Sequence, residues 1–452
     1  MYLNKKIERY ILIYLIILVS IPVISDKLRV LLLPVCIYYV FLINRYNQYK
    51  REILLILVLM TPLSILKPYY TLGIDITQLF IFMYIANIVL RFIIFKKKRI
   101  KVDLELISIL FYMILGMILL NFIISRIDIR VKFVDFRNYI IIVLIYIIFS
   151  KYFNIKRFFE LVLYGLTLSS FITLIIYFLG DINHLGLLAI EGRYTWGYQT
   201  LYIISIPIIM FFMFQKDKSF KNKAYYIFSI IVQVSGLLLG QNRTAIILVL
   251  FNLLFVFITM LIIYLKSKKN KLKIILLIFL NIVILISLIF AINNGIKNNS
   301  EVITRFLDVM NKTGTIDNIT TRNNTNMYYI EAIKNKLLGY GIGSKMYMYN
   351  ENNSPYQLGY FIDNAFITMA YKLGVAILGI IILIILGTNI ILIKKRNKGF
   401  ILLYSLVSVN LVAIAGGMMT AQIINNNAVS FFFWALIGVI KCNNYRVKGK
   451  NE

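Results

Sequence analysis

Long apolar runs dominate the chain, and short clusters of charged residues separate them. Most runs span roughly 15–22 residues, close to the 20 or so that a helix needs to cross the hydrocarbon layer of a membrane. Because lipid offers the backbone no hydrogen-bond partner, apolar runs of this length predict helices rather than strands. We therefore expect an all-α fold, a polytopic transmembrane helical bundle of about 12–14 helices.

The apolar runs give fourteen candidate segments, several of them short. They lie near residues 10–24, 28–43, 53–66, 75–95, 104–124, 138–149, 158–179, 199–214, 224–239, 244–265, 274–292, 362–393, 400–416 and 428–440.

Lysine and arginine alternate between the two sets of connections that these segments define. The set that includes both chain ends carries about twice as many Lys and Arg as the other set, and such a bias marks the cytoplasmic side of a membrane protein. We therefore expect both termini in the cytoplasm and a location in a bacterial cytoplasmic membrane. The connections at 180–198, 240–243 and 293–360 are then extracytoplasmic.

Composition supports the membrane interpretation and excludes a second one. The chain is 60% hydrophobic with a mean hydropathy of +0.81, whereas a soluble domain is about 45–50% apolar. A net charge of +30 in a soluble protein would suggest a nucleic-acid partner. Here the charge lies mainly in short loops on one side, so we expect a lipid bilayer as partner and no nucleic acid.

One connection is much longer than the others and divides the chain. We expect transmembrane helices in 1–292, an extracytoplasmic loop in 293–360, and further transmembrane helices with a cytoplasmic tail in 361–452. A loop of this length usually has a function. Apolar residues at Ile330, Ile333 and Leu337 predict an amphipathic helix over 326–338, ended by the glycines at 339, 341 and 343.

Three isolated arginines fall on the predicted outer side, against the charge bias: Arg193, Arg243 and Arg322. A guanidinium group binds phosphate through two parallel hydrogen bonds. Arg243 also directly precedes the start of a predicted helix, where free backbone amides favour an anion. The alternative is that each arginine extends to lipid headgroups. The three together on one side favour a site for a phosphorylated ligand.

Asp363 and Asn364 open the apolar segment that follows the long loop. A carboxylate at the membrane edge is suited to act as a general base, and low-dielectric surroundings raise its pKa. The alternative role for Asp363 is to cap the helix that follows. Asp75 and Lys372 lie near membrane depth, where an ionisable side chain is a candidate functional residue.

The remaining polar residues give weaker signals. Glu191 lies two residues before Arg193 and is a candidate ion-pair partner for it. His184 is the only histidine, so a histidine metal cluster is excluded. The chain has no Asp-x-Asp pair of the kind that chelates a metal beside a sugar nucleotide. We expect no metal and no cofactor.

The order of these motifs resembles the O-antigen ligase and polymerase superfamily, which includes the Wzy-type bacterial polysaccharide polymerases. Residues 190–380 carry the resemblance, and the first 180 match in hydropathy alone. Its motifs are Arg-Tyr-Thr-x-Gly at 193–197, Leu-Gly-Gln-Asn-Arg-Thr-Ala at 239–245, Arg322, Leu-Gly-Tyr-Gly-Ile-Gly at 338–343, and Asp363-Asn-x-Phe followed by Gly374.

The resemblance implies a metal-independent membrane glycosyltransferase that uses a glycan carried on undecaprenyl pyrophosphate. A polymerase of this type builds O-antigen, capsule or exopolysaccharide from repeat units at the outer face of the membrane. Arg193, Arg243 and Arg322 would bind the pyrophosphate and stabilise it as a leaving group. Glu191, Lys345 and Asn364 are further expected substrate contacts, and Asp363 or Glu191 is the expected base. A chain-length regulator and a flippase are expected partners.

Two other functions remain as alternatives to a polymerase. Ligases of the family carry His-Asn where this chain has Asp363-Asn364, and this departure favours the polymerase over a ligase that transfers glycan to another acceptor. A flippase for lipid-linked oligosaccharides also has about twelve to fourteen helices, but it should have two comparable halves and short loops. The single dominant loop argues against that transporter.

Overall fold

A computed structural model describes the following residues: 51–52, 54–55, 81–87, 105–150, 155–179, 188–190, 193–195, 199–213, 220–239, 248–258, 316–349, 354–359, 362, 364–394 and 427–448. Four predicted apolar segments, 10–24, 28–43, 274–292 and 400–416, lie outside this set, as do Asp75 and His184.

The described part of the chain is mostly helical, which confirms the all-α class. The labelled helices are α5 (Leu106–Ile124), α6 (Ile129–Phe149), α7 (Ile155–Leu179), α8 (Gln199–Met213), α9 (Phe220–Leu239), α13 (Ile316–Asn335), α14 (Ala365–Leu373), α15 (Ala376–Lys394) and α17 (Asn427–Lys448).

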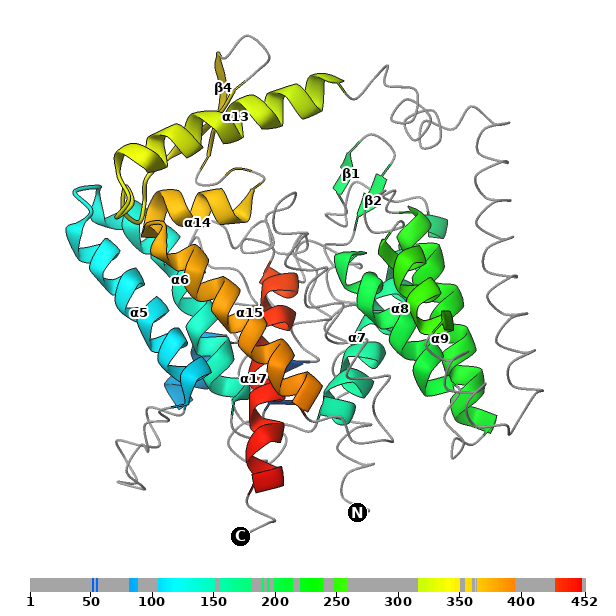
Figure 1. Cartoon of the computed structure of the whole chain (residues 1–452). Helices are drawn as coiled ribbons and strands as arrows, with labels where there is room; N and C mark the ends of the chain where they lie inside the picture. Colours follow the sequence, from blue (N-terminus) through cyan, green and yellow to red (C-terminus); the bar gives the residue numbers. More distant parts are fainter. Residues whose placement is uncertain are drawn as a thin grey trace.

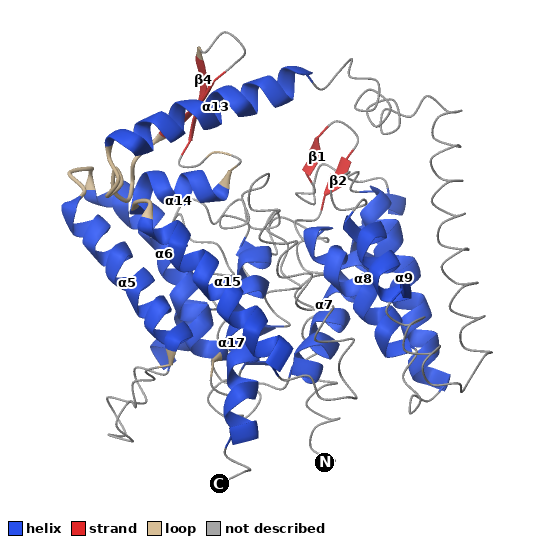
Figure 2. Cartoon of the chain, viewed as in Figure 1, coloured by secondary structure: helices blue, strands red, loops and turns tan. Residues whose placement is uncertain are grey.

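Strands form two short antiparallel hairpins in the described residues (Figure 2). Strands β1 (Leu188–Ile190) and β2 (Arg193–Thr195) pair with Ala189 opposite Tyr194. Strands β3 (Met346–Tyr349) and β4 (Pro355–Gly359) pair with Met346 opposite Gly359, and their register is irregular after Met348. Both hairpins belong to connections that we expected to be extracytoplasmic.

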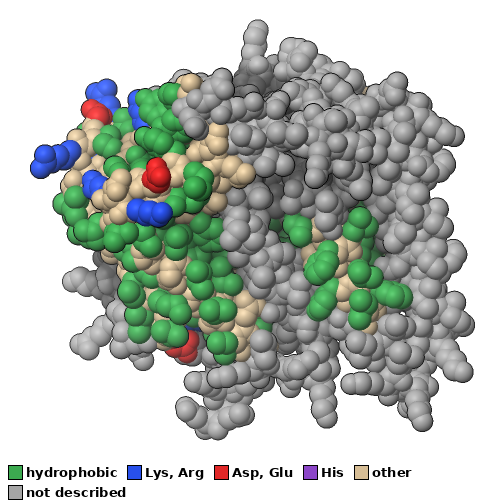
Figure 3. Space-filling model, turned by 45° about the horizontal axis from the view of Figure 1, so that its top comes forward, with side chains coloured by type: hydrophobic (Ala, Val, Ile, Leu, Met, Phe, Trp, Pro, Cys, Tyr) green, Lys and Arg blue, Asp and Glu red, His purple; other side chains and the backbone are tan. Residues whose placement is uncertain are grey.

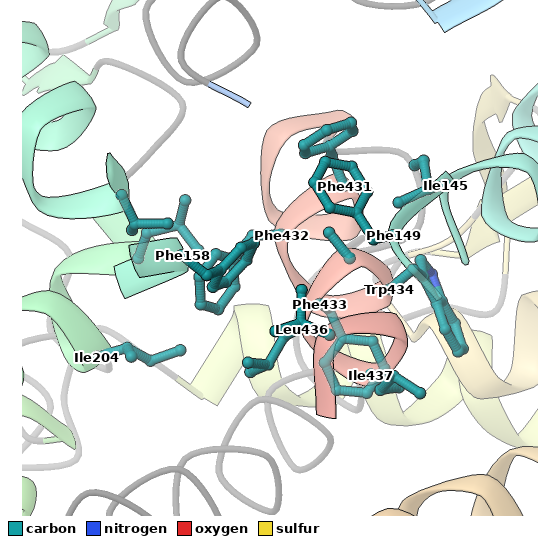
Figure 4. Close-up of a cluster of buried hydrophobic side chains, with 14 of the residues drawn as sticks. Ile145, Phe149, Phe158, Ile204, Phe431, Phe432, Phe433, Trp434, Leu436 and Ile437 are labelled. Atoms are coloured by element: carbon teal, nitrogen blue, oxygen red, sulfur yellow. The ribbon is translucent and has the colours of Figure 1, made fainter. Parts of the chain in front are cut away.

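Helix α17 lies at the centre of the molecule and joins two groups of helices (Figure 1). On one side it packs against α6 and α15, and on the other it packs against α7. Residues 431–441 of α17 are all buried. Figure 4 shows Phe431 and Trp434 near Phe149 and Ile145 of α6, while Phe432 lies near Phe158 of α7. The hydrophobic core is therefore continuous between the two groups.

Two helices, α6 and α13, begin about ten residues earlier than the hydrophobic pattern predicts. Helix α6 starts at Ile129 rather than near 138, capped by the Asp128 side chain, which accepts from the Arg130 amide at 2.8 Å. Helix α13 covers Ile316–Asn335 rather than 326–338. The added turns are rich in charged or polar residues, so an apolar pattern could not detect them. The glycines at 339–343 follow the helix in a separate loop.

The predicted segment 362–393 is two helices, α14 and α15, separated at Gly374. Gly374 has φ +95°, and its amide donates to the carbonyl of Ala370 at 2.9 Å, which ends α14. An added Cβ at Gly374 would lie 2.9 Å from the Leu337 carbonyl oxygen. Close approach of another segment and a left-handed backbone therefore both require glycine here.

Among the described residues, α5 alone is long and apolar enough to cross a membrane by the criteria of length and hydropathy. Shorter apolar helical stretches are Leu201–Met210, Lys223–Leu237, Leu248–Ile258, Ala376–Leu392 and Phe431–Lys441.

Candidate functional site

Helices α13 and α14, the β1–β2 hairpin and the turn between α5 and α6 lie at one end of the helix bundle (Figure 1). We call this the α13 end. The visible Lys and Arg side chains of the described residues gather there, and the flank below them is largely hydrophobic (Figure 3). Helix α17 runs away from the α13 end, so its basic C-terminal turns lie at the opposite end of the bundle.

Arg322 is exposed on α13, in the N-terminal half of that helix. One turn later, the Thr325 hydroxyl accepts a hydrogen bond from the Tyr349 amide at 2.9 Å. The Tyr329 hydroxyl accepts from the Tyr347 amide at 2.5 Å. These two bonds attach β3 to the buried face of α13, while Arg322 lies at an exposed position of the same helix.

A cluster of tyrosines connects α13, the β3–β4 hairpin and α14. Tyr371 of α14 packs edge-on against Tyr329 with ring centroids 4.8 Å apart, and it stacks on Tyr340 at 4.4 Å. Tyr349 lies 4.3 Å from Tyr328. Burial raises the pKa of Tyr329 to about 12, so its phenol is neutral at physiological pH. The cluster fixes α13 above α14.

Asn364 is the N-cap of α14, and its side chain accepts a hydrogen bond from the Ile367 amide at 3.1 Å. The capping role that we considered for Asp363 therefore belongs to the next residue. Asp363 lies outside the described residues, and its role as a base stays a prediction. Asn364 is half-buried, and the predicted contact of this residue with substrate stays a prediction as well.

Residues 336–344 form a loop, which we call the glycine loop, between α13 and β3. Gly339, Gly341 and Gly343 have φ values of +86°, +94° and +91°. The loop packs on the C-terminal end of α14, where the Tyr340 amide donates to the Tyr371 carbonyl at 2.7 Å. Lys345 follows directly and is exposed, which leaves it available for the substrate contact predicted for it.

A buried ion pair lies beneath the glycine loop. Lys372 Nζ of α14 donates to Asp135 Oδ2 of α6 at 2.5 Å, and the Gly343 amide donates to the same oxygen at 2.8 Å. The side chain of Lys372 is 0% exposed and that of Asp135 is 4% exposed. The ring of Tyr139 lies 6.0 Å from Lys372 Nζ. Lys372, expected to be functional from its depth, thus has a defined partner.

Besides Asp363, three predicted site residues, Glu191, Arg193 and Arg243, are described only in part or not at all. Arg193 begins β2 and pairs with Ile190 through the backbone, and β2 lies against α9. Glu191 and Arg243 lie outside the described residues, so the predicted pairing of Glu191 with Arg193 and the anion site near Arg243 stay predictions. Of the candidate residues, Arg322, Lys345, Asn364 and the backbone of Arg193 belong to elements at the α13 end.

Asp135 is the polar residue at the α13 end that sequence reasoning missed. It lies in Val-Lys-Phe-Val-Asp-Phe-Arg, a stretch that reads as a charged connection rather than a helix. Helical spacing was the available signal. Ile141, Ile142 and Ile145 lie on the buried face of α6, and stepping back from them by whole helical turns leads to position 135 on the same face.

In the part of the chain that the structure describes, no three His, Cys, Asp or Glu side chains come together in a way that could hold a metal ion. Neither a protein-family model nor a curated protein matches the chain.

Proposed function

We propose that this protein is a membrane-embedded polymerase of surface polysaccharide. Its substrates are oligosaccharide repeat units carried on undecaprenyl pyrophosphate, at the outer face of a bacterial cytoplasmic membrane. The α13 end faces outward in this proposal, and both termini lie in the cytoplasm. The protein transfers the growing chain from its lipid carrier to the next lipid-linked unit, without a metal or cofactor.

Apolar side chains on the outside of the bundle support the membrane location. Helix α5 exposes Leu106, Met113, Leu120 and Ile123, and α15 exposes Ile382, Leu383, Leu386 and Ile390. Soluble monomers rarely expose contiguous apolar surface of this kind, and such a surface is matched to lipid chains.

The observation that carries the proposal is the gathering of candidate ligand-binding groups at the α13 end. Exposed Arg322 lies on α13, and exposed Lys345 follows the glycine loop that leaves this helix. Helix α14, capped by Asn364, lies directly beneath α13. Cationic side chains at the edge of an apolar bundle are suited to bind a phosphate group whose lipid tail lies in the membrane.

The transfer needs one bond to form and one to break at the anomeric carbon of the donor sugar. A hydroxyl oxygen of the acceptor unit bonds to this carbon, and its proton passes to a carboxylate, for which Asp363 and Glu191 are the candidates. The bond from the carbon to the pyrophosphate oxygen breaks, and undecaprenyl pyrophosphate departs with the electron pair. Arg322 would stabilise the charge that develops on this leaving group.

The test uses cells in which the polymer depends on this protein. Arg322→Ala should lower chain lengthening by about 100-fold or more, as loss of a group that stabilises transition-state charge does. Arg322→Lys should restore little of it, because lysine lacks the planar pair of donors. Lys334→Ala is the matched control, since Lys334 is an exposed cation in the last turn of the same helix.

Gel analysis of the glycan gives the answer, together with the amount of single repeat units on the lipid carrier. We expect single units to accumulate in both Arg322 variants while the control makes polymer of normal length. Wild-type chain length in Arg322→Ala, at normal protein levels in the membrane, would refute the proposed site.

A further inference from the structure

The carboxylate of Asp135 is shared by three segments that are far apart in the sequence. It belongs to α6, it accepts from Lys372 of α14, and it accepts from the amide of Gly343 in the glycine loop. The bonds to Lys372 and Gly343 converge on one oxygen atom, Oδ2. This single oxygen atom therefore links the glycine loop to both α6 and α14.

Backbone hydrogen bonds attach the same loop to the end of α14. The Gly341 amide donates to the Lys372 carbonyl at 3.1 Å, and the Val375 amide donates to the Leu337 carbonyl at 2.9 Å. The last carbonyls of a helix have no partner within the helix, and amides of the loop supply partners for two of those of α14, the carbonyls of Tyr371 and Lys372. On the other side, the Ser125 hydroxyl donates to the Ile342 carbonyl at 2.8 Å.

Stability alone is a poor explanation for a buried ion pair at this place. Withdrawing two charges from water offsets much of their attraction, and apolar side chains of similar size often serve as well. An apolar pair, however, offers no acceptor to the amide of Gly343. The glycine loop also has little freedom to find another partner, because an added Cβ at Gly341 would lie 2.9 Å from Ser125 Cβ.

We propose that Asp135 is a positioning residue for the transfer reaction and that Lys372 balances its charge and orients it. Asp135 anchors the glycine loop through Gly343, and the loop sets the relative placement of Arg322 on α13 and Lys345 before β3. Through Lys372 the same carboxylate fixes α14, the helix that Asn364 caps. This inference rests on the proposed function.

Two double variants separate the effect of the hydrogen-bond acceptor at position 135 from the effect of the buried charges. Asp135→Asn with Lys372→Met removes both charges and keeps an oxygen acceptor for Gly343. Asp135→Leu with Lys372→Met removes both charges and the acceptor. Neither variant leaves an uncompensated buried charge, so both should insert and fold. Ser170→Ala is the control, because Ser170 lies in α7 and bonds Tyr202 of α8, away from the glycine loop.

Hydrogen–deuterium exchange of the full-length protein in lipid nanodiscs measures how firmly the glycine loop is held. In Asp135→Leu with Lys372→Met, amides 340–343 should exchange about tenfold faster, since a buried hydrogen bond is lost. Amides of α5 and α15 should keep wild-type protection. Asp135→Asn with Lys372→Met and Ser170→Ala should both keep the loop protected.

The rate at which the same samples polymerise lipid-linked repeat units measures the transfer reaction. The maximal rate should fall about tenfold in Asp135→Leu with Lys372→Met, with little change in the substrate concentration for half-maximal rate, because misplaced groups affect the transfer step more than binding. Asp135→Asn with Lys372→Met should retain most of the rate.

The outcomes separate this inference from the proposed function. Equal loop protection in the two double variants would overturn the anchoring role. Faster loop exchange with an unchanged polymerisation rate would overturn the positioning role. Wild-type protein that makes no polymer would refute the proposed function, whereas a difference in loop exchange between the double variants would still support anchoring by Asp135.

Discussion

The two groups of helices that meet at α17 differ in the buried polar contacts within each group. In the group of α7, α8 and α9 the buried side-chain contacts between helices are neutral: Ser170 donates to Tyr202 at 2.6 Å, and Ser205 and Thr167 both bond Gln233. In the group of α5, α6, α14 and α15 an ion pair lies beneath a loop without regular structure. Neutral bonds join regular helices, while the ionic contact holds an irregular segment that carries candidate site residues.

This difference has a physical basis. Helices satisfy their own backbone groups, so a single hydroxyl or amide bond is enough to set how two of them pack. The glycine loop has no such internal ladder, and its amides need partners from outside. A carboxylate accepts several hydrogen bonds at once, and the cation of Lys372 compensates its charge.

The largest effect is expected from breaking the ion pair on one side. Lys372→Met leaves the Asp135 carboxylate buried without its counterion and should cost roughly 3–5 kcal/mol of stability. Asp135→Leu with Lys372→Met should cost less than this single change. Unfolding of the purified protein in detergent measures both. A single variant as stable as the double variant would show that the pair is not charged in the folded protein.

A smaller loss is expected from substituting a glycine of the loop. Gly339→Ala forces a side chain into a left-handed backbone, a strain of about 1–3 kcal/mol. The added Cβ would also lie 2.6 Å from the Gly374 amide nitrogen. Gly116→Ala in α5 is the matched control, because nothing lies within 4 Å of its added Cβ. The control should be neutral or stabilising, and equal unfolding temperatures for the two variants would contradict the packing of the loop on α14.

The smallest effect is expected among the neutral contacts of the other group. Ser170→Ala removes the bond to Tyr202 and should cost about 0.6 kcal/mol, the average for a hydrogen bond between membrane helices. The same unfolding experiment measures it. A loss as large as that of Lys372→Met would show that the polar contacts of the two groups do not differ in their contribution to stability.

Much of the fold could be predicted from hydropathy, and the exceptions have physical causes. The segments that became α5, α7, α8 and α9 were predicted closely, since each is a continuous apolar run. The break at Gly374 was missed because it depends on a left-handed backbone and on contact with Leu337, which lies far away in the sequence. Hydropathy records neither.

The candidate site was predicted less completely than the helices. Lys372 was singled out by its depth, but its partner Asp135 lies 237 residues away, and no local pattern connects the two. Asn364 rather than Asp363 caps α14, a choice that depends on backbone geometry at one residue. A helix in the long loop was predicted, but Arg322 was expected before it; Arg322 lies within α13, which begins ten residues earlier than predicted.

The most direct test of the account is a reaction with purified wild-type protein in lipid vesicles. Lipid-linked repeat units are the only substrate, a chelator is present, and products are separated by length. The account predicts a ladder of products with two or more units and release of undecaprenyl pyrophosphate as chains lengthen. Recovery of single units alone, from protein that is folded and correctly inserted, would contradict the central claim.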